Sequence, residues 1–325
     1  MTVTLDAADV FALGPDGAVA ALREALARGL DPDGDAPRAV VPLAHGQGLL
    51  MPSEHGGWYG VKAATVAPGN AARGLRRINA TYLLHDSATL TPVALLDGVA
   101  LTTLRTPAVS VAACLDRLRA LAGGGGGLRL VVFGAGPQAE GHVAAVRAHV
   151  PVADVVVVTR SEGPVPCWAD RRTTAVRGGA AAAVRRADVV VTATSARVPV
   201  VDGRLVRDGA VVLAVGSHEP DARELDSVLM GRATVLVESR ATALREAGDV
   251  VMAIGEGALA PDDLVTLADP RGPAAGAPAD RPLVVKTCGM GWQDLVVAVA
   301  ALRPLPRRAH LPPGERTEGG PAEPS

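Results

Sequence analysis

The stretch LRLVVFGAGPQAEGH, residues 128–142, constrains the fold of this chain more than any other part. An apolar run ends in a glycine turn and a helical pattern follows, which is the order typical of a dinucleotide-binding unit. Gly134 permits the tight turn, Gly136 lets a pyrophosphate approach bare backbone, and Ala139 lets helix and strand pack closely. Free N–H groups at the helix N-terminus would face the phosphates. The cofactor contacts predicted here are Gly134, Gly136, Pro137 and Gln138.

Short valine-rich runs alternate with helical stretches after this turn. The helical run covers residues 179–186, and the apolar runs cover residues 154–159, 188–192, 210–215 and 233–237. Runs of this kind, without polar alternation, are typical of parallel strands that are covered on both faces. The pattern predicts an α/β fold, a Rossmann-type doubly wound parallel sheet, with a nicotinamide cofactor as the leading ligand.

The charge balance and the aromatic content argue against nucleic acid as a partner. The chain carries 32 Lys and Arg against 34 Asp and Glu, and only 2% of its residues are aromatic. It therefore lacks both a basic field and stacking platforms. With 325 residues, 48% of them hydrophobic, it can bury a sizeable core, and its length predicts about two domains.

Cysteine, histidine and terminal patterns indicate the environment of the chain. The three cysteines are far apart and lack a CxxC spacing, which favours a reducing compartment. His45, His55 and His85 have no metal-ligand spacing, so no metal site is expected. Asp6 and Asp9 stand where a signal peptide needs basic and apolar residues, and no apolar run approaches the length of a membrane span. We therefore expect a cytoplasmic protein without membrane contact.

Five consecutive glycines, Gly123–Gly127, mark a boundary because such a run is too flexible for the interior of an element. The patterns before the boundary predict two helices, over residues 15–29 and 108–122. They also predict a mostly antiparallel sheet with one cover helix, from runs at residues 39–43, 58–66, 80–84 and 92–96.

The last part of the chain has three distinct patterns. Residues 283–286 read as a final strand, and residues 292–302 as an apolar helix that returns to the first domain. Residues 304–325 are dense in Pro, Gly and charge, which predicts a disordered tail. We thus expect a smaller α+β substrate-binding and dimerisation domain (residues 1–122 with 291–303) and a dinucleotide-binding domain (residues 123–290).

The residues after the second predicted strand of the nucleotide unit bear on cofactor choice. A carboxylate at this place binds the ribose 2′-OH of NAD, whereas an arginine suits the 2′-phosphate of NADP. The chain has no carboxylate at the strand end, and Arg160 with Ser161 could clamp a phosphate. NADP(H) is therefore favoured, while the nearby Glu162 leaves NAD(H) open.

Two cations lie in apolar surroundings in the first domain. Lys62 is within the strand-like YGVKAATV, and Arg105 follows the apolar LTTL just before an expected helix start at Thr106. Burying a cation carries a desolvation penalty of roughly several kcal/mol unless an anion lies beside it. A substrate carboxylate could supply that anion.

Several motifs together resemble the ornithine cyclodeaminase/mu-crystallin family. They are LLMP (49–52), WYGVKAATVAPGN (58–70), LLDGVALTTLRTPAVS (95–110), FGAGPQAE, VTATSA, GSHEPDARELD and KTCGMGWQD, in the family's order over nearly the whole chain except the tail. The resemblance implies a homodimeric NAD(P) enzyme that acts on amino acids or their imines. It implies that Arg38, Lys62 and Arg105 grip the substrate α-carboxylate. It also implies cofactor contacts at Thr192, Thr194, Ser195, Lys286 and Thr287.

Two departures from the cyclodeaminases concern acidic residues. Leu49 stands where they carry a glutamate before LMP, and His218 stands where they carry an aspartate. Both groups would be needed to hold a diamino acid and move its protons, so ornithine cyclodeamination is doubtful. His218 could instead be a proton donor or acceptor, because its ordinary pKa is near neutrality.

The sequence therefore predicts an NADP(H)-preferring reductase or dehydrogenase acting on the C–N bond of an α-imino or α-amino acid. Lys62, His218 or a water would deliver the proton. Two alternatives stay open. One is a cyclodeaminase that recycles bound NAD, and the other is a non-catalytic protein that holds NADPH and a small ligand.

Overall fold

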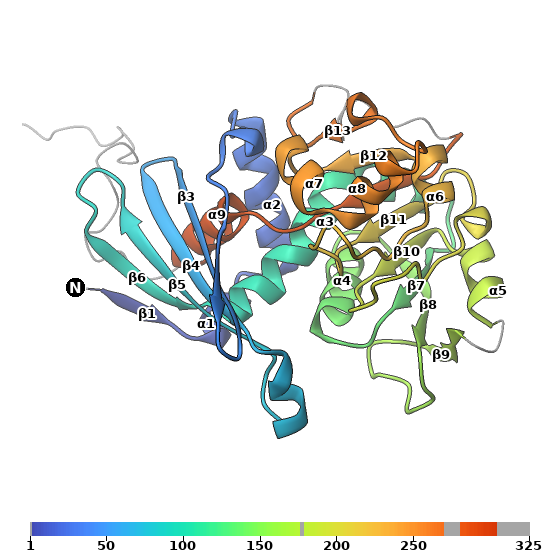
Figure 1. Cartoon of the computed structure of the whole chain (residues 1–325), viewed down its shortest axis with the longest axis horizontal. Helices are drawn as coiled ribbons and strands as arrows, with labels where there is room; N and C mark the ends of the chain where they lie inside the picture. Colours follow the sequence, from blue (N-terminus) through green and yellow to red (C-terminus); the bar gives the residue numbers. More distant parts are fainter. Residues whose placement is uncertain (1, 176–178, 270–279, 304–325) are drawn as a thin grey trace, which may run out of the picture.

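A computed structural model describes residues 2–175, 179–269 and 280–303 of the chain. Two sheets form two lobes, and the long helix α3 (Gly98–Ala122) lies between them (Figure 1). The glycine run predicted as a boundary leads from α3 into the first strand of the second lobe. The predicted tail lies outside the described residues.

The first sheet has the strand order β1-β6-β5-β4-β3-β2. Its pairs are antiparallel except β1 with β6, so the prediction of a mostly antiparallel sheet is confirmed, although β1 and β3 were not foreseen. The strands are β1 (Val3–Leu5), β2 (Ala39–Leu43), β3 (Gly46–His55), β4 (Trp58–Val66), β5 (Ile78–Asp86) and β6 (Pro92–Asp97).

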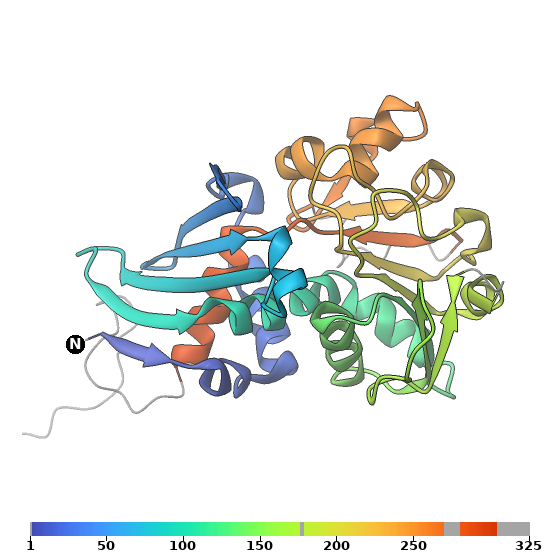
Figure 2. The same ribbon diagram turned by 60° about the horizontal axis from the view of Figure 1, so that its bottom comes forward.

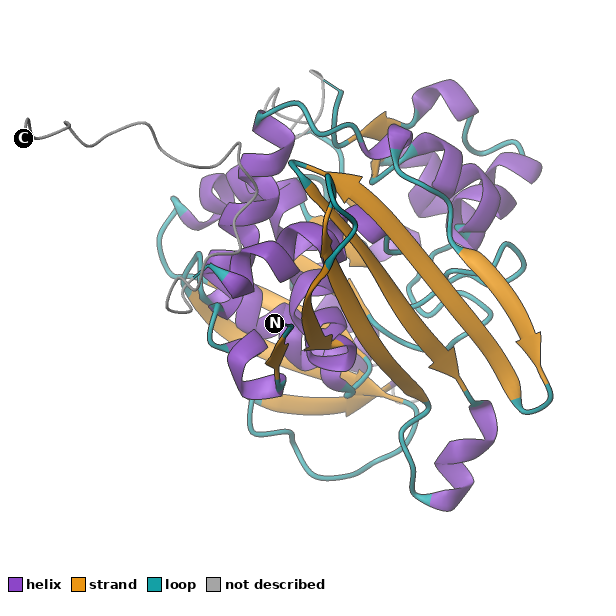
Figure 3. Cartoon of the chain, turned by 90° about the vertical axis from the view of Figure 1, so that its left-hand side faces the viewer, coloured by secondary structure: helices purple, strands orange, loops and turns teal. Residues whose placement is uncertain are grey.

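Several helices cover one face of this sheet, so the prediction of a single cover helix is wrong. They are α1 (Ala7–Phe11), α3 and α9 (Gly291–Leu302), while α2 (Gly14–Ala27) packs on α3 and α9. The return of the last helix to the first domain is confirmed, because α9 packs on β3, β4 and α2 (Figure 2). The other face of the sheet carries no covering helix among the described residues (Figure 3).

Helix α3 begins at Gly98, well before the start that the sequence predicted at residues 106–108. Asp97 caps it by accepting from the N–H groups of Val99 and Ala100, and the helix continues through Pro107. Arg105 therefore lies inside the helix and not before it. Contrary to expectation, α3 is long and apolar enough to span a membrane, but 78% of its most apolar window is buried inside the protein.

The second sheet is parallel throughout and has the order β13-β12-β14-β11-β10-β7-β8-β9, which confirms the predicted α/β class. The last strand inserts between β11 and β12. The strands are β7 (Leu128–Phe133), β8 (Val152–Thr159), β9 (Arg171–Thr174), β10 (Val189–Thr192), β11 (Val211–Ala214), β12 (Thr234–Val237), β13 (Val265–Thr266) and β14 (Leu283–Lys286). The helices are α4 (Pro137–Arg147), α5 (Gly179–Arg186), α6 (Ser227–Arg232), α7 (Arg240–Glu246) and α8 (Gly248–Gly255).

Candidate active site

The glycine turn after β7 has the geometry of a phosphate cradle. Gly134 has φ +107°, and a Cβ there would lie 2.5 Å from the carbonyl oxygen of Ala193, so only glycine fits. Gly136 is the N-cap of α4 and a Cβ on it would meet nothing within 4 Å. Pro137 begins the helix, where a missing N–H costs little. Open space in front of a helix N-terminus fits a pyrophosphate group.

Thr102 of α3 joins this turn to the substrate domain. Its carbonyl oxygen accepts from the Gln138 side chain at 3.4 Å, and its hydroxyl lies 3.2 Å from Lys62 Nζ. The Oε1 atom of Gln138 is buried without a partner in the described part of the chain. Gln138, predicted as a cofactor contact, therefore also bridges the two domains. Thr102 thus contacts both Lys62 and the first turn of α4.

A buried cluster forms where β4, α3 and α9 meet. Lys62 Nζ lies 2.9 Å and 2.7 Å from the two carboxylate oxygens of Asp294, and Arg105 Nε lies 3.2 Å from the first of them. Arg105 also donates to Gln293 Oε1 at 2.8 Å. The anion beside the two cations is thus Asp294, a residue that sequence reasoning missed. Its only signal was a carboxylate and an amide opening the apolar helix WQDLVVAVAAL.

The ammonium group of Lys62 is easily deprotonated for a lysine. Burial lowers the pKa of Lys62 to about 8, and the positive charges of Arg105 and Arg38 act in the same direction, whereas Asp294 opposes them. Lys62 is therefore mostly protonated at neutral pH and can release that proton at little cost. This is the behaviour that general acid catalysis requires.

Arg38 closes the cluster from the segment before β2. Its guanidinium lies 2.9 Å from a carboxylate oxygen of Glu246 at the end of α7, and it donates to the carbonyl oxygens of Cys288 and Gly289. The structure thus brings together the three predicted cations Arg38, Lys62 and Arg105. It also gives each of them an internal partner, which the sequence did not indicate.

Glu238, directly after β12, extends the network into the dinucleotide-binding domain. It accepts from Gln293 Nε2 at 2.6 Å and from the Cys288 N–H at 2.7 Å. Burial raises the pKa of Glu238. Gln293 thus connects Glu238 with Arg105, so polar contacts run from β12 to β4. The position of Glu238 after the apolar run ATVLV was a signal that sequence reasoning passed over.

His218 lies half-buried in the loop after β11. Burial lowers its pKa, and Arg38 is the next largest cause, with Glu219 opposing. The imidazole is therefore neutral at neutral pH and close to the cationic cluster. A neutral imidazole can accept a proton, whereas proton donation as a general acid needs the charged imidazolium form.

The hydroxyl groups of Thr192 and Thr194 are committed within the protein. Both donate to the fully buried carboxylate of Glu224, which also accepts from the N–H groups of Thr194 and Gly216. Their side chains bind Glu224, and the expected contact of these two threonines with the cofactor stays a prediction. Ser195 is exposed beyond β10 and stays a candidate contact.

Lys286 is likewise committed, because its side chain is completely buried. It donates to the Ser217 carbonyl oxygen at 2.6 Å and lies 3.1 Å from Asp249 Oδ2. Asp249 in turn accepts from the N–H group of Glu224. The predicted cofactor contact Lys286 therefore fixes the loop after β11. The hydroxyl of Thr287 is buried and has no partner among the residues that the structure describes.

Arg160 and Ser161 are exposed directly after β8, where the cofactor ribose lies in this fold class. Arg172 of β9, which sequence reasoning missed, donates to the Thr159 hydroxyl at 2.9 Å and to the Ser161 carbonyl oxygen at 3.0 Å. It also donates to the Pro164 carbonyl oxygen. Arg172 thus orders the loop on which Arg160 stands.

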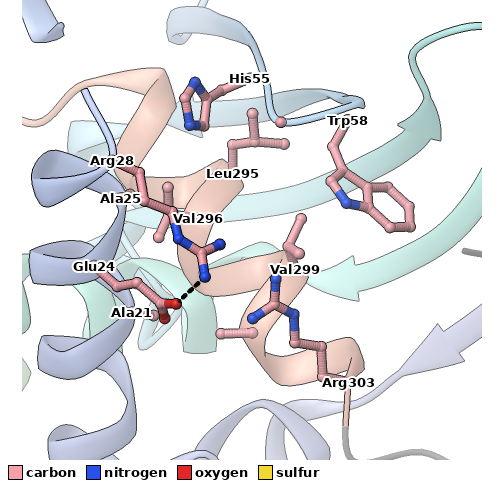
Figure 4. A pocket seen from close by; sticks show the side chains of 12 residues that line it. Ala21, Glu24, Ala25, Arg28, His55, Trp58, Leu295, Val296, Val299 and Arg303 are labelled. Atoms are coloured by element: carbon pink, nitrogen blue, oxygen red, sulfur yellow. Dashed lines mark ion pairs between the residues drawn. The ribbon is translucent and has the colours of Figure 1, made fainter. Parts of the chain in front are cut away.

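A separate hollow lies along α9, between this helix and α2 (Figure 4). Its volume is about 90 Å³, and Trp58, Leu295 and Val299 are among its lining residues. Arg28 at its rim is paired with Glu24 at 2.5 Å. The guanidinium of Arg28 therefore already has an anionic partner. None of the glycine-turn residues lines the hollow. In the described ranges, no three His, Cys, Asp or Glu residues are grouped to hold a metal.

Comparisons with known proteins identify the family of the chain. The model of the ornithine cyclodeaminase/mu-crystallin family matches residues 18–300. A Delta(1)-pyrroline-2-carboxylate reductase of Bacillus cereus is 34% identical over 275 residues, 80% of this chain and 83% of its own length. Ketimine reductase mu-crystallin of Mus musculus is 32% identical over 294 residues, 89% of this chain and 86% of its own length.

A solved structure extends the likeness to the fold. Thermococcus litoralis Delta(1)-pyrroline-2-carboxylate reductase, in complex with NADH and L-proline, superimposes with a TM-score of 0.78 at 24% identity, covering 92% of this chain and 96% of that one. The family model spans both lobes and includes the glycine turn and all members of the cationic cluster. The chain therefore belongs to the ornithine cyclodeaminase/mu-crystallin family.

Proposed function

We propose that this chain reduces the C=N bond of an α-imino acid with a reduced nicotinamide cofactor. The observation that carries the proposal is the buried cluster of Lys62, Arg105 and Asp294, joined through Thr102 to the glycine turn. The names of the relatives at 34% and 32% identity, a pyrroline-2-carboxylate reductase and a ketimine reductase, support the same chemistry. NAD(P)H, when bound, supplies the hydride.

The residues of the cluster divide into two roles in this proposal. Lys62 holds the proton that goes to the imine nitrogen. Arg105 and Arg38 orient the substrate carboxylate, which must share them with Asp294 and Glu246. His218, neutral and close to Arg38, is the other candidate for moving a proton.

The first experiment measures oxidation of NADPH and, separately, NADH by the purified protein. The substrates are Δ1-pyrroline-2-carboxylate, Δ1-piperideine-2-carboxylate, and pyruvate with ammonia. We expect oxidation of at least one cofactor with a cyclic imine. Silence with all three substrates, together with ammonia release from ornithine without net change in the cofactor, would replace the proposal by cyclodeamination. Cofactor binding without any turnover would indicate a binding protein.

Activity should follow the protonation of Lys62. Because Lys62 must donate a proton and its pKa is about 8, kcat/KM for imine reduction is expected to fall as pH rises through about 8. The chain has only two lysines, Lys62 and Lys286, so ¹³C-lysine NMR can titrate Lys62 directly. A Lys62 titration near the ordinary lysine value of about 10.4 would contradict this assignment.

We propose NADP(H) as the preferred cofactor, with Arg160 as the group that binds the 2′-phosphate. Arg160→Ala is expected to raise KM for NADPH about tenfold to hundredfold, the worth of a charge-assisted hydrogen bond, and to leave KM for NADH nearly unchanged. Arg171→Ala is the matched control, because Arg171 is paired with Asp154 at the other end of β8. Equal losses with both cofactors would remove Arg160 from this role.

We also propose that the chain forms a homodimer through the uncovered face of the first sheet. Val41, Leu43 and Leu50 are 44%, 52% and 45% exposed, and the strand register puts them on this face, opposite to the face of Lys62. Leu50→Glu is expected to convert the dimer to monomer in light scattering, since a charge would then be buried in the interface. Val198→Glu, at a residue 69% exposed in the other lobe, is the control. A dimer that survives Leu50→Glu would place the interface elsewhere.

A further inference from the structure

Helix α9 begins without a capping side chain of its own. Its N-cap residue is Met290, which makes no side-chain hydrogen bond to the first turn. The free N–H groups of a first turn need acceptors, and here one comes from a distant segment. Asp35 Oδ2 accepts from the Trp292 N–H at 2.9 Å. Asp35 lies between the short 3-10 helix Pro32–Gly34 and β2.

The same segment holds the start of α9 from a second side. Arg38, three residues after Asp35, donates to the carbonyl oxygens of Cys288 and Gly289 at 3.0 Å and 2.7 Å. Asp35 thus binds an N–H group just after the helix start, and Arg38 binds two carbonyl groups just before it. These contacts fix the position and the rotation of the first turn of α9.

That first turn carries the partners of the two buried cations. Gln293 and Asp294 directly follow Trp292, and Asp294 contacts both Lys62 and Arg105. A shift of the turn would therefore move the carboxylate away from Lys62. Asp294 is also one of the causes that raise the pKa of Asp35, after burial, so the two carboxylates lie close enough to repel each other. Asp35 keeps its place against that repulsion.

We propose that Asp35 is a positioning residue for the reduction. It acts through α9, by keeping Asp294 in contact with the Lys62 ammonium group, and touches neither substrate nor cofactor. The inference rests on the proposed function as far as the reaction is concerned. The effect of Asp35 on the pKa of Lys62 can be measured without any turnover.

Two variants of Asp35 separate the role of its hydrogen-bond acceptor from that of its negative charge. Asp35→Asn keeps an oxygen for the Trp292 N–H, whereas Asp35→Ala removes it. Asp31→Ala is the matched control, because Asp31 is in the same segment, is exposed, and accepts from the Asp33 N–H within its own turn. The full-length protein is used throughout.

We expect Asp35→Ala to lower kcat for imine reduction about tenfold to hundredfold, the range that a displacement of about 1 Å produces. The NMR titration of Lys62 should move to lower pH, because the ammonium loses contact with Asp294. Asp35→Asn should restore most of kcat and the Lys62 titration, and Asp31→Ala should change neither.

Three outcomes would overturn the proposal. One is an Asp35→Ala variant with a lower Tm but an unchanged kcat and Lys62 titration. Another is an equal loss in Asp31→Ala. The third applies if Asp35→Ala does not fold: a displaced Lys62 titration in Asp35→Asn would then contradict the proposal. A native Lys62 titration in Asp35→Asn would support it. A wild-type protein inactive on every imine would end the proposed function, while the Lys62 titration still decides the role of Asp35.

Discussion

Replacing Lys62 by methionine will abolish imine reduction and leave the affinity for the reduced cofactor unchanged. Methionine fills nearly the same volume but has no proton to give, and a lost general acid typically costs about a hundredfold to ten-thousandfold in rate. The glycine turn that holds the pyrophosphate is separated from Lys62 by Thr102, so cofactor binding should persist. Nicotinamide fluorescence measures the affinity, and steady-state kinetics measures the turnover.

The matched variant for this experiment is Lys62→Arg. It keeps the positive charge beside Asp294 but cannot release a proton near neutral pH, because the guanidinium pKa is above about 12. If Lys62→Arg turns over like the wild type, the lysine only balances charge. His218→Gln would then test whether His218, although neutral in the free protein, takes part in moving the proton.

The glycine turn and the central strands of the dinucleotide-binding domain could be predicted because the sequence patterns that specify them are local. The turn around Gly134 and the valine runs are each contained in a few neighbouring residues, and they specify strand, turn and helix directly. The order of the strands was less accessible. Leu283–Lys286 was recognised as a strand, but its place between β11 and β12 depends on pairing across the sheet.

The start of α3 shows where a local signal misleads. Pro107 indicated a helix start because proline removes a helical hydrogen bond. In the structure Pro107 is buried in the middle of the helix, and α4 packs directly on it. A Cβ at Gly141 would lie 2.8 Å from the proline ring. Contact between two lobes outweighs the local cost, and no window of sequence around Pro107 contains that contact.

The cations of the candidate site could be predicted from the sequence, but the carboxylates that pair with its polar groups could not. Lys62 and Arg105 stand out because charge is rare in apolar runs, which is a property of each residue alone. The partner Asp294 lies 232 residues from Lys62 in the sequence. Glu224 was hidden for the same reason, and the sequence therefore gave no sign that the hydroxyl groups of Thr192 and Thr194 donate to it. Pairing across such distances is fixed by the fold.

Removing the charge of Asp294 is expected to destabilise the fold strongly. Asp294→Asn keeps the shape of the side chain but leaves Lys62 and Arg105 buried without their anion. Breaking a buried ion pair from one side costs about 3–5 kcal/mol in the free energy of unfolding. Chemical denaturation of the single variant measures this loss. Asp116→Asn, at the partly exposed ion pair with Arg23, is the control.

The double variant Asp294→Asn with Lys62→Met tests the cause of the loss. If uncompensated charge is responsible, removing one cation should recover a large part of the lost free energy, and the two changes should not be additive. Additive losses would mean that Asp294 stabilises α9 independently of Lys62. A carboxylate ligand such as L-proline should also stabilise Asp294→Asn more than the wild type, because its carboxylate can serve as the missing anion. Such a gain would show that Asp294 and the substrate carboxylate compete for the same two cations.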